Sequence, residues 1–126
     1  MALDIMQNSS GNLVWDNGLT TGVMSADEYS YLVPVVSNRV SIAIEHPTGD
    51  IVGVYYVEGV DDPNDTPVAI ENESGTAVQA AKTSGNSLIA RLDLIDLACK
   101  FVRVFFDFTS GTTGPGATAT VHQVKR

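Results

Sequence analysis

The sequence has little cysteine, few basic residues and no long apolar run, and each shortage excludes a class of protein. Its one cysteine, Cys99, cannot form an internal disulfide, so nothing indicates an oxidising compartment. No stretch of the 126 residues approaches the ~18 apolar residues of a membrane span. Residues 1–12 lack the basic region and apolar run of a signal peptide. We therefore expect a soluble protein without a membrane partner.

Basic residues are scarce as well as unevenly placed. Seven Lys and Arg stand against 15 Asp and Glu, and the net charge of −8 argues against nucleic acid as a partner. Residues 1–81 carry a net charge of −11, whereas residues 82–126 carry +3. This asymmetry is compatible with a docking face of one sign. It need not form a spatial dipole, because strands from both halves interleave in a sandwich fold.

Motifs that carry catalysis are also missing. There is no P-loop, no dinucleotide-binding fingerprint and no His/Cys cluster with metal-ligand spacing. Cys99 could pair only with His46 or His122, and Leu97-Ala98-Cys99 resembles a small buried apolar segment, so we predict a core cysteine. No spacing among the acids selects a pair for glycoside hydrolysis. The sequence predicts no catalytic residue, no cofactor and no enzyme activity.

Two groups of residues could bind a ligand, and each has a simpler interpretation. Asp61, Asp62, Asn64 and Asp65 could offer oxygens to Ca²⁺, but their spacing fits no EF-hand and is typical of a solvated turn, so we predict no metal site. A sugar-binding sandwich would use exposed aromatic rings, for which the candidates are Trp15, Tyr29, Tyr31, Tyr55 and Tyr56. Tyr55 and Tyr56 are adjacent in a strand, so at most one can lie in the core.

Short β-forming runs separated by turn residues recur along the chain. This pattern predicts an all-β, single-domain β-sandwich, jelly-roll-like, with about eight short antiparallel strands over residues 13–126 and an N-terminal arm over residues 1–12. The arm is either disordered or laid on a neighbour. The expected strands are 13–15, 29–36, 39–45, 51–57, 67–70, 76–82, 87–92, 101–108 and a last strand rich in Ala and Thr. Residues 19–24, after the turn Asp16-Asn17-Gly18, are a candidate continuation of the first strand.

Three of these runs carry positional information. Pro34 cannot donate to a sheet ladder, so residues 29–36 belong at an edge or a bulge. Residues 51–57 are apolar on both faces, which places this strand centrally or against a partner subunit. Residues 76–82 have some helical propensity, but they lack a cap signal and we favour a strand.

The strand over residues 101–108 has two different faces. Val102, Val104, Phe106 and Phe108 form an unbroken apolar row, which predicts the core side. The other face holds Phe101, Arg103, Phe105 and Asp107. This second face is too apolar to be purely solvated, so we interpret it as an interface.

Two segments resemble small virion proteins of tailed bacteriophages. Residues 51–70, IVGVYYVEGVDDPNDTPVAI, are similar to a strand–acidic turn–strand element of these proteins. Residues 93–124, DLIDLACKFVRVFFDFTSGTTGPGATATVHQV, resemble their terminal hairpin. The nearest resemblance is to head decoration (cement) proteins. It implies a homo-oligomer, dimer or trimer, made in the host cytoplasm, that binds the major capsid protein on the capsid exterior.

Under this hypothesis the contact elements are the arm, the run 29–36, the second face of the strand 101–108 and the basic C-terminus. The expected interface residues are Leu3, Ile5, Met6, Tyr31, Val33, Phe101, Arg103, Phe105, Lys125 and Arg126. The alternative function is a carbohydrate-binding or tail-associated β-sandwich module for host recognition, which requires Trp15 or a tyrosine exposed on a concave sheet face.

Overall fold

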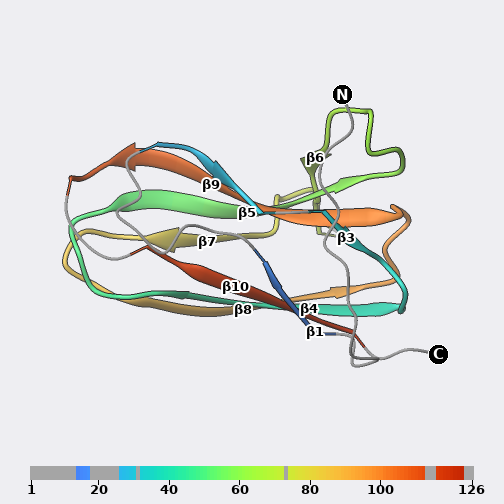
Figure 1. Ribbon diagram of the computed structural model, residues 1–126, viewed down its shortest axis with the longest axis horizontal. Helices are drawn as coiled ribbons and strands as arrows, with labels where there is room; N and C mark the ends of the chain where they lie inside the picture. The colour runs from blue at the N-terminus through green and yellow to red at the C-terminus, as the bar shows by residue number, and fades with distance from the viewer. Residues whose placement is uncertain (1–13, 18–25, 31, 73, 113–115, 124–126) are drawn as a thin grey trace.

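The protein is all-β, with its strands in two antiparallel sheets packed face to face (Figure 1). The computed structural model describes residues 14–17, 26–30, 32–72, 74–112 and 116–123. The strands of these residues are β1 Val14–Asn17, β2 Glu28–Tyr29, β3 Val33–Pro34, β4 Arg39–His46, β5 Val52–Val60, β6 Val68–Ala69, β7 Gln79–Lys82, β8 Leu88–Ile95, β9 Phe101–Ser110 and β10 Thr118–Gln123. The described residues contain no helix that is long and apolar enough to cross a membrane.

The strand order is that of a jelly roll. One sheet has the order β1-β10-β4-β8. In the other sheet β2 and β3 both pair with β9, β9 pairs with β5, and β6 and β7 both pair with β5. If β2/β3 and β6/β7 are each counted as one interrupted strand, eight strand positions remain, arranged 1-8-3-6 and 2-7-4-5. The predicted all-β sandwich is therefore confirmed, together with its jelly-roll-like order.

The core lies between the two sheets and follows the period of two in the sequence. In β4 the inward side chains are Val40, Ile42 and Ile44, and in β9 they are Val102, Val104 and Phe106; all six are buried. The apolar row predicted for residues 101–108 is therefore confirmed, with Phe108 partly buried at its end. Each fully buried side chain of this size contributes roughly 1.5–3 kcal/mol to folding.

The positional predictions for Pro34 and β5 are also confirmed. Pro34 lies in β3 on the outer side of β9, where its missing N–H breaks no central ladder. The Gln123 side chain joins this edge to the other sheet, because its Nε2 donates to Pro34 O at 2.8 Å and its Oε1 accepts from Val36 N at 2.8 Å. β5 is central, with β9 on one side and β6 and β7 on the other.

Gly53 allows β5 and β9 to approach closely beside a buried ring. A Cβ at this position would lie 2.4 Å from Phe106 Cζ and 2.6 Å from Asp107 O. The pairing of β5 with β9 shifts register between Val52 and Gly53. A glycine is required there because any side chain would collide with the core.

Some boundaries differ from the prediction. β8 continues three residues past Leu92 to Ile95, because it pairs with β4 without interruption from Leu88 opposite His46 to Ile95 opposite Arg39. Asp96, at φ 55°, then ends the strand. Asp16 and Asn17, predicted as a turn, belong to β1 and pair with β10. The expected arm 1–12 and the strand 19–24 lie outside the described residues.

Candidate interaction surface

His46 and Tyr55 form a polar contact inside the core. His46 Nδ1 lies 2.7 Å from the Tyr55 hydroxyl, and both side chains are buried against the Phe106 ring. Burial raises the pKa of the Tyr55 phenol far above its usual value, because the protein interior disfavours the phenolate. Tyr56, the next residue, points outward and is half-buried. The prediction that at most one of the two tyrosines is in the core is therefore confirmed.

Lys82 is a second buried polar side chain. Its ammonium donates to three backbone carbonyls, those of Gly49 at 3.2 Å, Ile51 at 3.0 Å and Thr83 at 2.8 Å. Burial lowers the pKa of Lys82, while the nearby charge of Asp50 raises it. These bonds tie the end of β7 to the segment between β4 and β5. They use all three protons of the ammonium, so we assign Lys82 a structural role.

Cys99 and His46 lie at different places in the sandwich. The Cys99 thiol packs against β5 at Gly59, where an added Cβ would lie 2.7 Å from the sulfur. His46 contacts Tyr55, four residues earlier along β5, which corresponds to roughly 13 Å. Burial raises the pKa of the Cys99 thiol, which disfavours the reactive thiolate. This geometry matches a thiol packed against the core.

The acidic loop after β5 has ordinary turn geometry. Asp62 Oδ1 accepts hydrogen bonds from the backbone and side-chain nitrogens of Asn64, at 2.9 and 3.0 Å. Asp61 Oδ1 accepts from Lys100 N at 3.1 Å, which fixes the loop to the start of β9. Within the described part of the chain, no three His, Cys, Asp or Glu residues gather closely enough to hold a metal ion.

The outer face of the six-stranded sheet carries a cluster of rings around Arg103. We call Tyr29, Tyr56, Glu58, Arg103 and Phe105 the aromatic face. The rings of Tyr29 and Phe105 are stacked at 4.7 Å with an interplanar angle of 15°, and Tyr56 lies 6.3 Å from Phe105 on the other side of β9. Tyr29 remains 49% exposed. The cluster arises because β2 and β5 flank β9 in a register that places these side chains opposite one another.

Arg103 is held in this cluster by two interactions. Its Nε donates to Glu58 Oε1 at 2.8 Å, and its guanidinium carbon lies 4.1 Å from the centre of the Tyr29 ring. The Arg103 and Glu58 side chains are only 12% and 13% exposed. A cation held against an aromatic ring and a partly desolvated carboxylate is well ordered, so the face is preorganised for contact.

The structure places some of the residues predicted for the interface. Phe101, Arg103 and Phe105 are half-buried on the outer side of β9, so the structure brings these three together on one face. Val33 is fully buried in the core, because β3 pairs with β9 and turns this side chain inward; this placement corrects its assignment to the surface. The remaining predicted interface residues, Leu3, Ile5, Met6, Tyr31, Lys125 and Arg126, lie outside the described residues.

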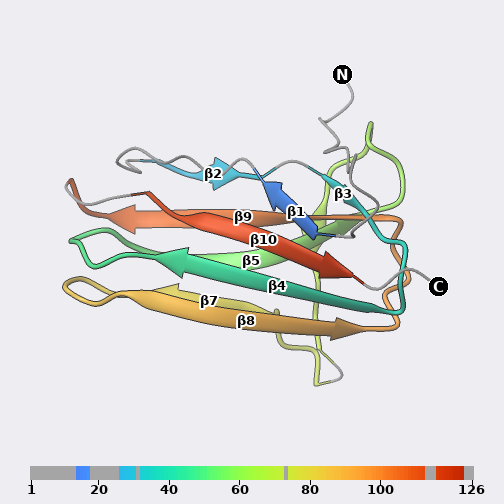
Figure 2. The same cartoon turned by 60° about the horizontal axis from the view of Figure 1, so that its bottom comes forward.

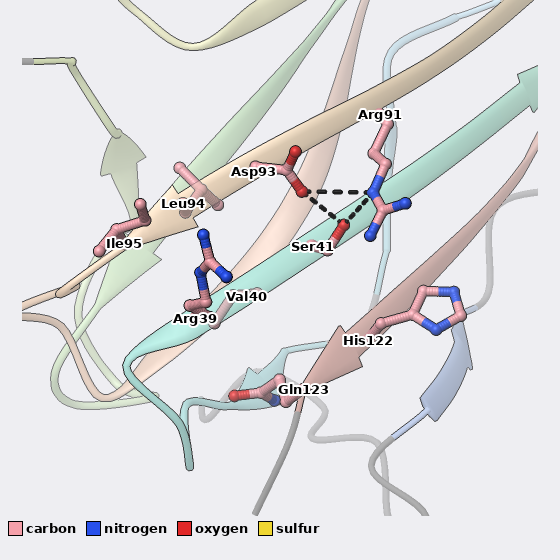
Figure 3. A pocket seen from close by; sticks show the side chains of 9 residues that line it. All are labelled: Arg39, Val40, Ser41, Arg91, Asp93, Leu94, Ile95, His122 and Gln123. Atoms are coloured by element: carbon pink, nitrogen blue, oxygen red, sulfur yellow. Dashed lines mark hydrogen bonds and ion pairs between the residues drawn. The ribbon is translucent and has the colours of Figure 1, made fainter.

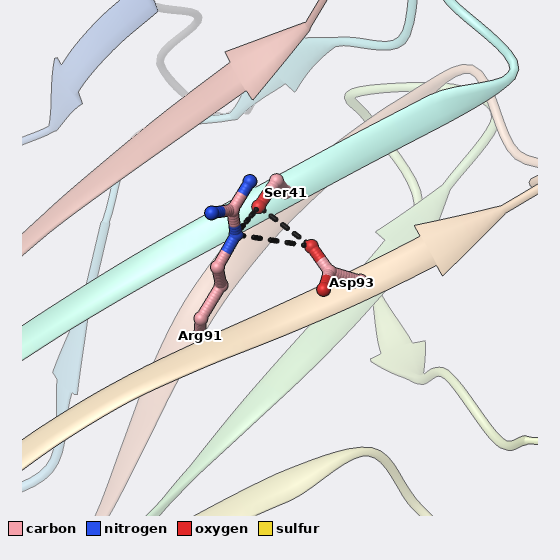
Figure 4. Close-up of polar contacts among 3 residues, drawn as sticks. All are labelled: Ser41, Arg91 and Asp93. Carbon is pink, nitrogen blue, oxygen red and sulfur yellow. Dashed lines mark hydrogen bonds and ion pairs between the residues drawn. The ribbon is translucent and has the colours of Figure 1, made fainter.

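A second outward surface lies on the four-stranded sheet and was not foreseen. It is a pocket lined across β8, β4 and β10 by side chains that include Arg39, Ser41, Arg91, Asp93 and His122 (Figure 3). Arg91 Nε donates to Ser41 Oγ at 2.7 Å, and Ser41 Oγ donates to Asp93 Oδ1 at 2.7 Å (Figure 4). The Ser41 hydrogen bond lowers the pKa of Asp93, and Arg91 adds to this effect. The alternation of charged residues at 91 and 93 was the available sequence signal.

Comparison with known proteins gives one structural similarity. No protein family matches the chain, and no curated protein matches it either. Among solved structures, the SPBc2 prophage-derived protein YomS is similar, with 13% sequence identity and a TM-score of 0.47. The alignment covers 91% of this chain and 98% of that protein.

Proposed function

We propose that this chain is a structural virion protein, a decoration or cement protein that binds the outer shell of a bacteriophage head and stabilises it. In this role it acts as a homo-oligomer, its partner is the major capsid protein, and it has no catalytic activity. The resemblance of residues 51–70 and 93–124 to head decoration proteins supports the proposal.

The observation that carries the proposal is the aromatic face. Tyrosine, phenylalanine and arginine are enriched in protein interfaces, and tyrosine and arginine are among the residues that contribute most to binding energy there. The face is formed by side chains of three paired strands, β2, β9 and β5, on the outer side of their sheet. An outward sheet face of this composition suits another protein surface better than a small substrate, which needs a concave site.

Stabilisation of the shell follows from linkage. If the aromatic face binds only the expanded shell, each bound copy lowers the free energy of that state by its binding free energy. Many copies on a symmetric lattice multiply the effect, and an oligomer that bridges neighbouring capsid subunits adds avidity.

The test uses expanded heads of the phage whose genome encodes the chain, prepared without this protein. We expect the purified protein to co-sediment with the heads and to raise their melting temperature. Tyr29→Ala should weaken binding about tenfold or more, as expected for a central interface aromatic. Glu45→Ala, an exposed change on the opposite sheet, is the control and should bind normally. Absence of wild-type binding would refute the proposal, and normal binding by Tyr29→Ala would refute the role of the aromatic face.

The exposure of Tyr29 also favours the second candidate, a carbohydrate-binding or tail-associated module for host recognition. A half-exposed ring on a sheet face is the kind of surface on which sugars stack. Binding of the wild-type protein to a glycan array, lost in Tyr29→Ala, would support this candidate. Silence on the array together with binding to heads would exclude it.

A further inference from the structure

β8 is the edge strand of the four-stranded sheet, and within the described residues its outer side is not paired with another strand. Its only strand partner among the described residues is β4, so its other side presents backbone N–H and C=O groups along eight residues. Figure 2 shows β8 along the rim of its sheet. The strand contains no proline, and its ladder with β4 has no bulge. Long, regular edges of this kind are usually protected, since they can pair with another chain.

The outward side chains of β8 are unusual for a solvated edge. They are Ile89, Arg91, Asp93 and Ile95, of which Ile89 is 80% and Ile95 58% exposed. The two isoleucines flank the two charges symmetrically about Leu92. The sequence of the strand, Leu-Ile-Ala-Arg-Leu-Asp-Leu-Ile, is therefore complementary to its own reverse.

Only one antiparallel register makes a β8–β8 pair complementary. With Leu92 opposite Leu92 of a second copy, Arg91 faces Asp93 and Ile89 faces Ile95 at all four outward positions. If Arg91 or Asp93, instead of Leu92, faced its own copy at the two-fold axis, like charges would lie opposite each other, which is destabilising. A register with the two-fold axis between two residues is also excluded. It would place an outward side chain opposite an inward one, whereas opposed residues in a sheet point to the same face.

We infer that β8 is a dimerisation strand: two copies of this chain pair their β8 edges antiparallel about a two-fold axis at Leu92, which joins two four-stranded sheets into one of eight strands. The occupant is a second copy because both the charge pattern and the apolar pattern are self-complementary, as a two-fold interface requires. Backbone hydrogen bonds along the edge supply affinity, and the outward pairs set the register.

The charged pair can change partners at little cost. Within one chain, Arg91 and Asp93 are 3.3 Å apart and lean over Ser41 of β4, and their side chains are 71% and 66% exposed. Exposed ion pairs of this kind contribute little to stability. Arg91 uses only Nε in these bonds, so its two Nη groups are available to meet Asp93 of the second copy. On the inward side, the half-buried Leu92 would meet its own counterpart and extend the core across the axis.

This inference rests on the homo-oligomeric part of the proposed function but not on capsid binding. Dimerisation is measured on the purified protein without heads, so either part can fail while the other stands. The strands that carry the aromatic face belong to the other sheet (Figure 1), so they take no part in the β8 pair.

The first test is a charge swap followed by sedimentation equilibrium of the full chain. We expect the wild type to be a dimer, and Arg91→Asp to raise the dissociation constant about tenfold or more, because each dimer then opposes two pairs of acids. Asp93→Arg should also raise the dissociation constant, because each dimer then opposes two pairs of arginines. The double variant Arg91→Asp/Asp93→Arg restores both pairs and should dimerise like the wild type. Lys100→Asp, an equal charge change at an exposed position outside β8, is the control.

The second test reads the register directly. In a Cys99→Ser background, Ile89→Cys/Ile95→Cys should form a covalent dimer under mild oxidation, because residues 89 and 95 face each other across the axis at a Cα distance of about 5 Å. Ile89→Cys alone should not cross-link, since the two copies of residue 89 lie six residues apart, or roughly 20 Å.

Circular dichroism verifies that each variant is folded. A wild-type protein that is monomeric at about 100 μM, well above typical dissociation constants of specific complexes, overturns the inference. So does a folded charge swap that fails to dimerise beside a dimeric wild type, or cross-linking of Ile89→Cys alone.

Discussion

At the scale of single residues, the core contains polar groups that its apolar neighbours would not suggest. Lys82 is as buried as the valines and isoleucines around it, yet its ammonium meets three carbonyl oxygens. His46 Nδ1 and the Tyr55 hydroxyl lie 2.7 Å apart beside Phe106. Buried polar groups are tolerated only when they are hydrogen-bonded, and these bonds fix segments that apolar packing alone would leave free to slide.

We predict that Lys82→Met destabilises the protein by about 1–3 kcal/mol, since the methionine fills the space but leaves carbonyls of Ile51 and Thr83 without this donor. The free energy of unfolding in urea is the measurement. Lys100→Met, at an exposed position, is the control and should change it by less than about 0.5 kcal/mol. Equal stability of the two variants would contradict the structural role of Lys82.

Tyr55 should make stability fall in alkaline solution. Its pKa is raised in the fold by burial, while the unfolded chain loses the phenol proton near pH 10. Its contribution is therefore fully present below about pH 10 and is lost as the pH rises further. Tyr55→Phe should cost about 1–2 kcal/mol at neutral pH, because His46 loses its hydroxyl partner.

The measurement for Tyr55 is the urea midpoint from pH 8 to 11. The difference between wild type and Tyr55→Phe should shrink above about pH 10. Burial lowers the pKa of Lys82, so the contribution of Lys82 to stability changes with pH in the opposite direction. Both proteins contain Lys82, so its effect cancels in the difference between them. A difference that stays constant to pH 11 would show that Tyr55 ionises in the folded protein.

At the scale of strands, β9 is the element on which most of the architecture depends. One face supplies Val102, Val104 and Phe106 to the core, and the other holds Arg103 and Phe105 beneath β2. The outer face is half-buried because Tyr29, more than 70 residues earlier in the chain, stacks on it. The strand therefore carries the core and the aromatic face at once.

We predict that Glu58→Gln destabilises the protein by about 1–3 kcal/mol, because it leaves the Arg103 charge in a partly desolvated position without its carboxylate. Added salt should reduce this loss little, since such pairs are weakly screened. Glu45→Gln, an exposed position on β4, should change stability by less than about 0.5 kcal/mol. Urea unfolding at low and high salt measures both variants, and equal losses would show that the Arg103–Glu58 pair acts as an ordinary surface pair.

At the scale of the whole molecule, the two sheets present different outward faces. The six-stranded sheet carries the aromatic face, and the four-stranded sheet ends in the β8 edge (Figure 2). In the proposed assembly, these surfaces separate the capsid contact from the contact between copies. A dimer could then bind two capsid sites without competition between its own interfaces.

We predict a melting temperature that rises with protein concentration, because a dimer that unfolds to monomers is stabilised by mass action. Scanning calorimetry over a hundredfold range of concentration measures this. The transition should be single, as expected for one domain of this size. The control is Arg91→Asp, whose melting temperature should depend less on concentration. A wild-type melting temperature that is independent of concentration would argue against dimerisation.

Features that depend on neighbours along the chain could be predicted from the amino-acid sequence. The alternation in β4 and β9 assigned the core faces correctly, because successive side chains of a strand point to opposite sides whatever the strand pairs with. Pro34 marked an edge because its missing N–H is a local property. The two apolar faces of residues 51–57 indicated a central strand, because the apolar pattern of a strand can be seen in its own residues.

Features that depend on which strands pair and pack together could not be predicted from the sequence and came from the folded sandwich. It placed Val33 inside, brought Tyr29 onto Phe105, buried Lys82 among three carbonyls and left β8 at an edge with its symmetrical pattern facing outward. None of these follows from the period of two, because that period defines two faces without saying what lies against either. Pairing between strands distant in the sequence is set by the packing of the whole sandwich, and the aromatic face and the β8 edge exist only once that packing is complete.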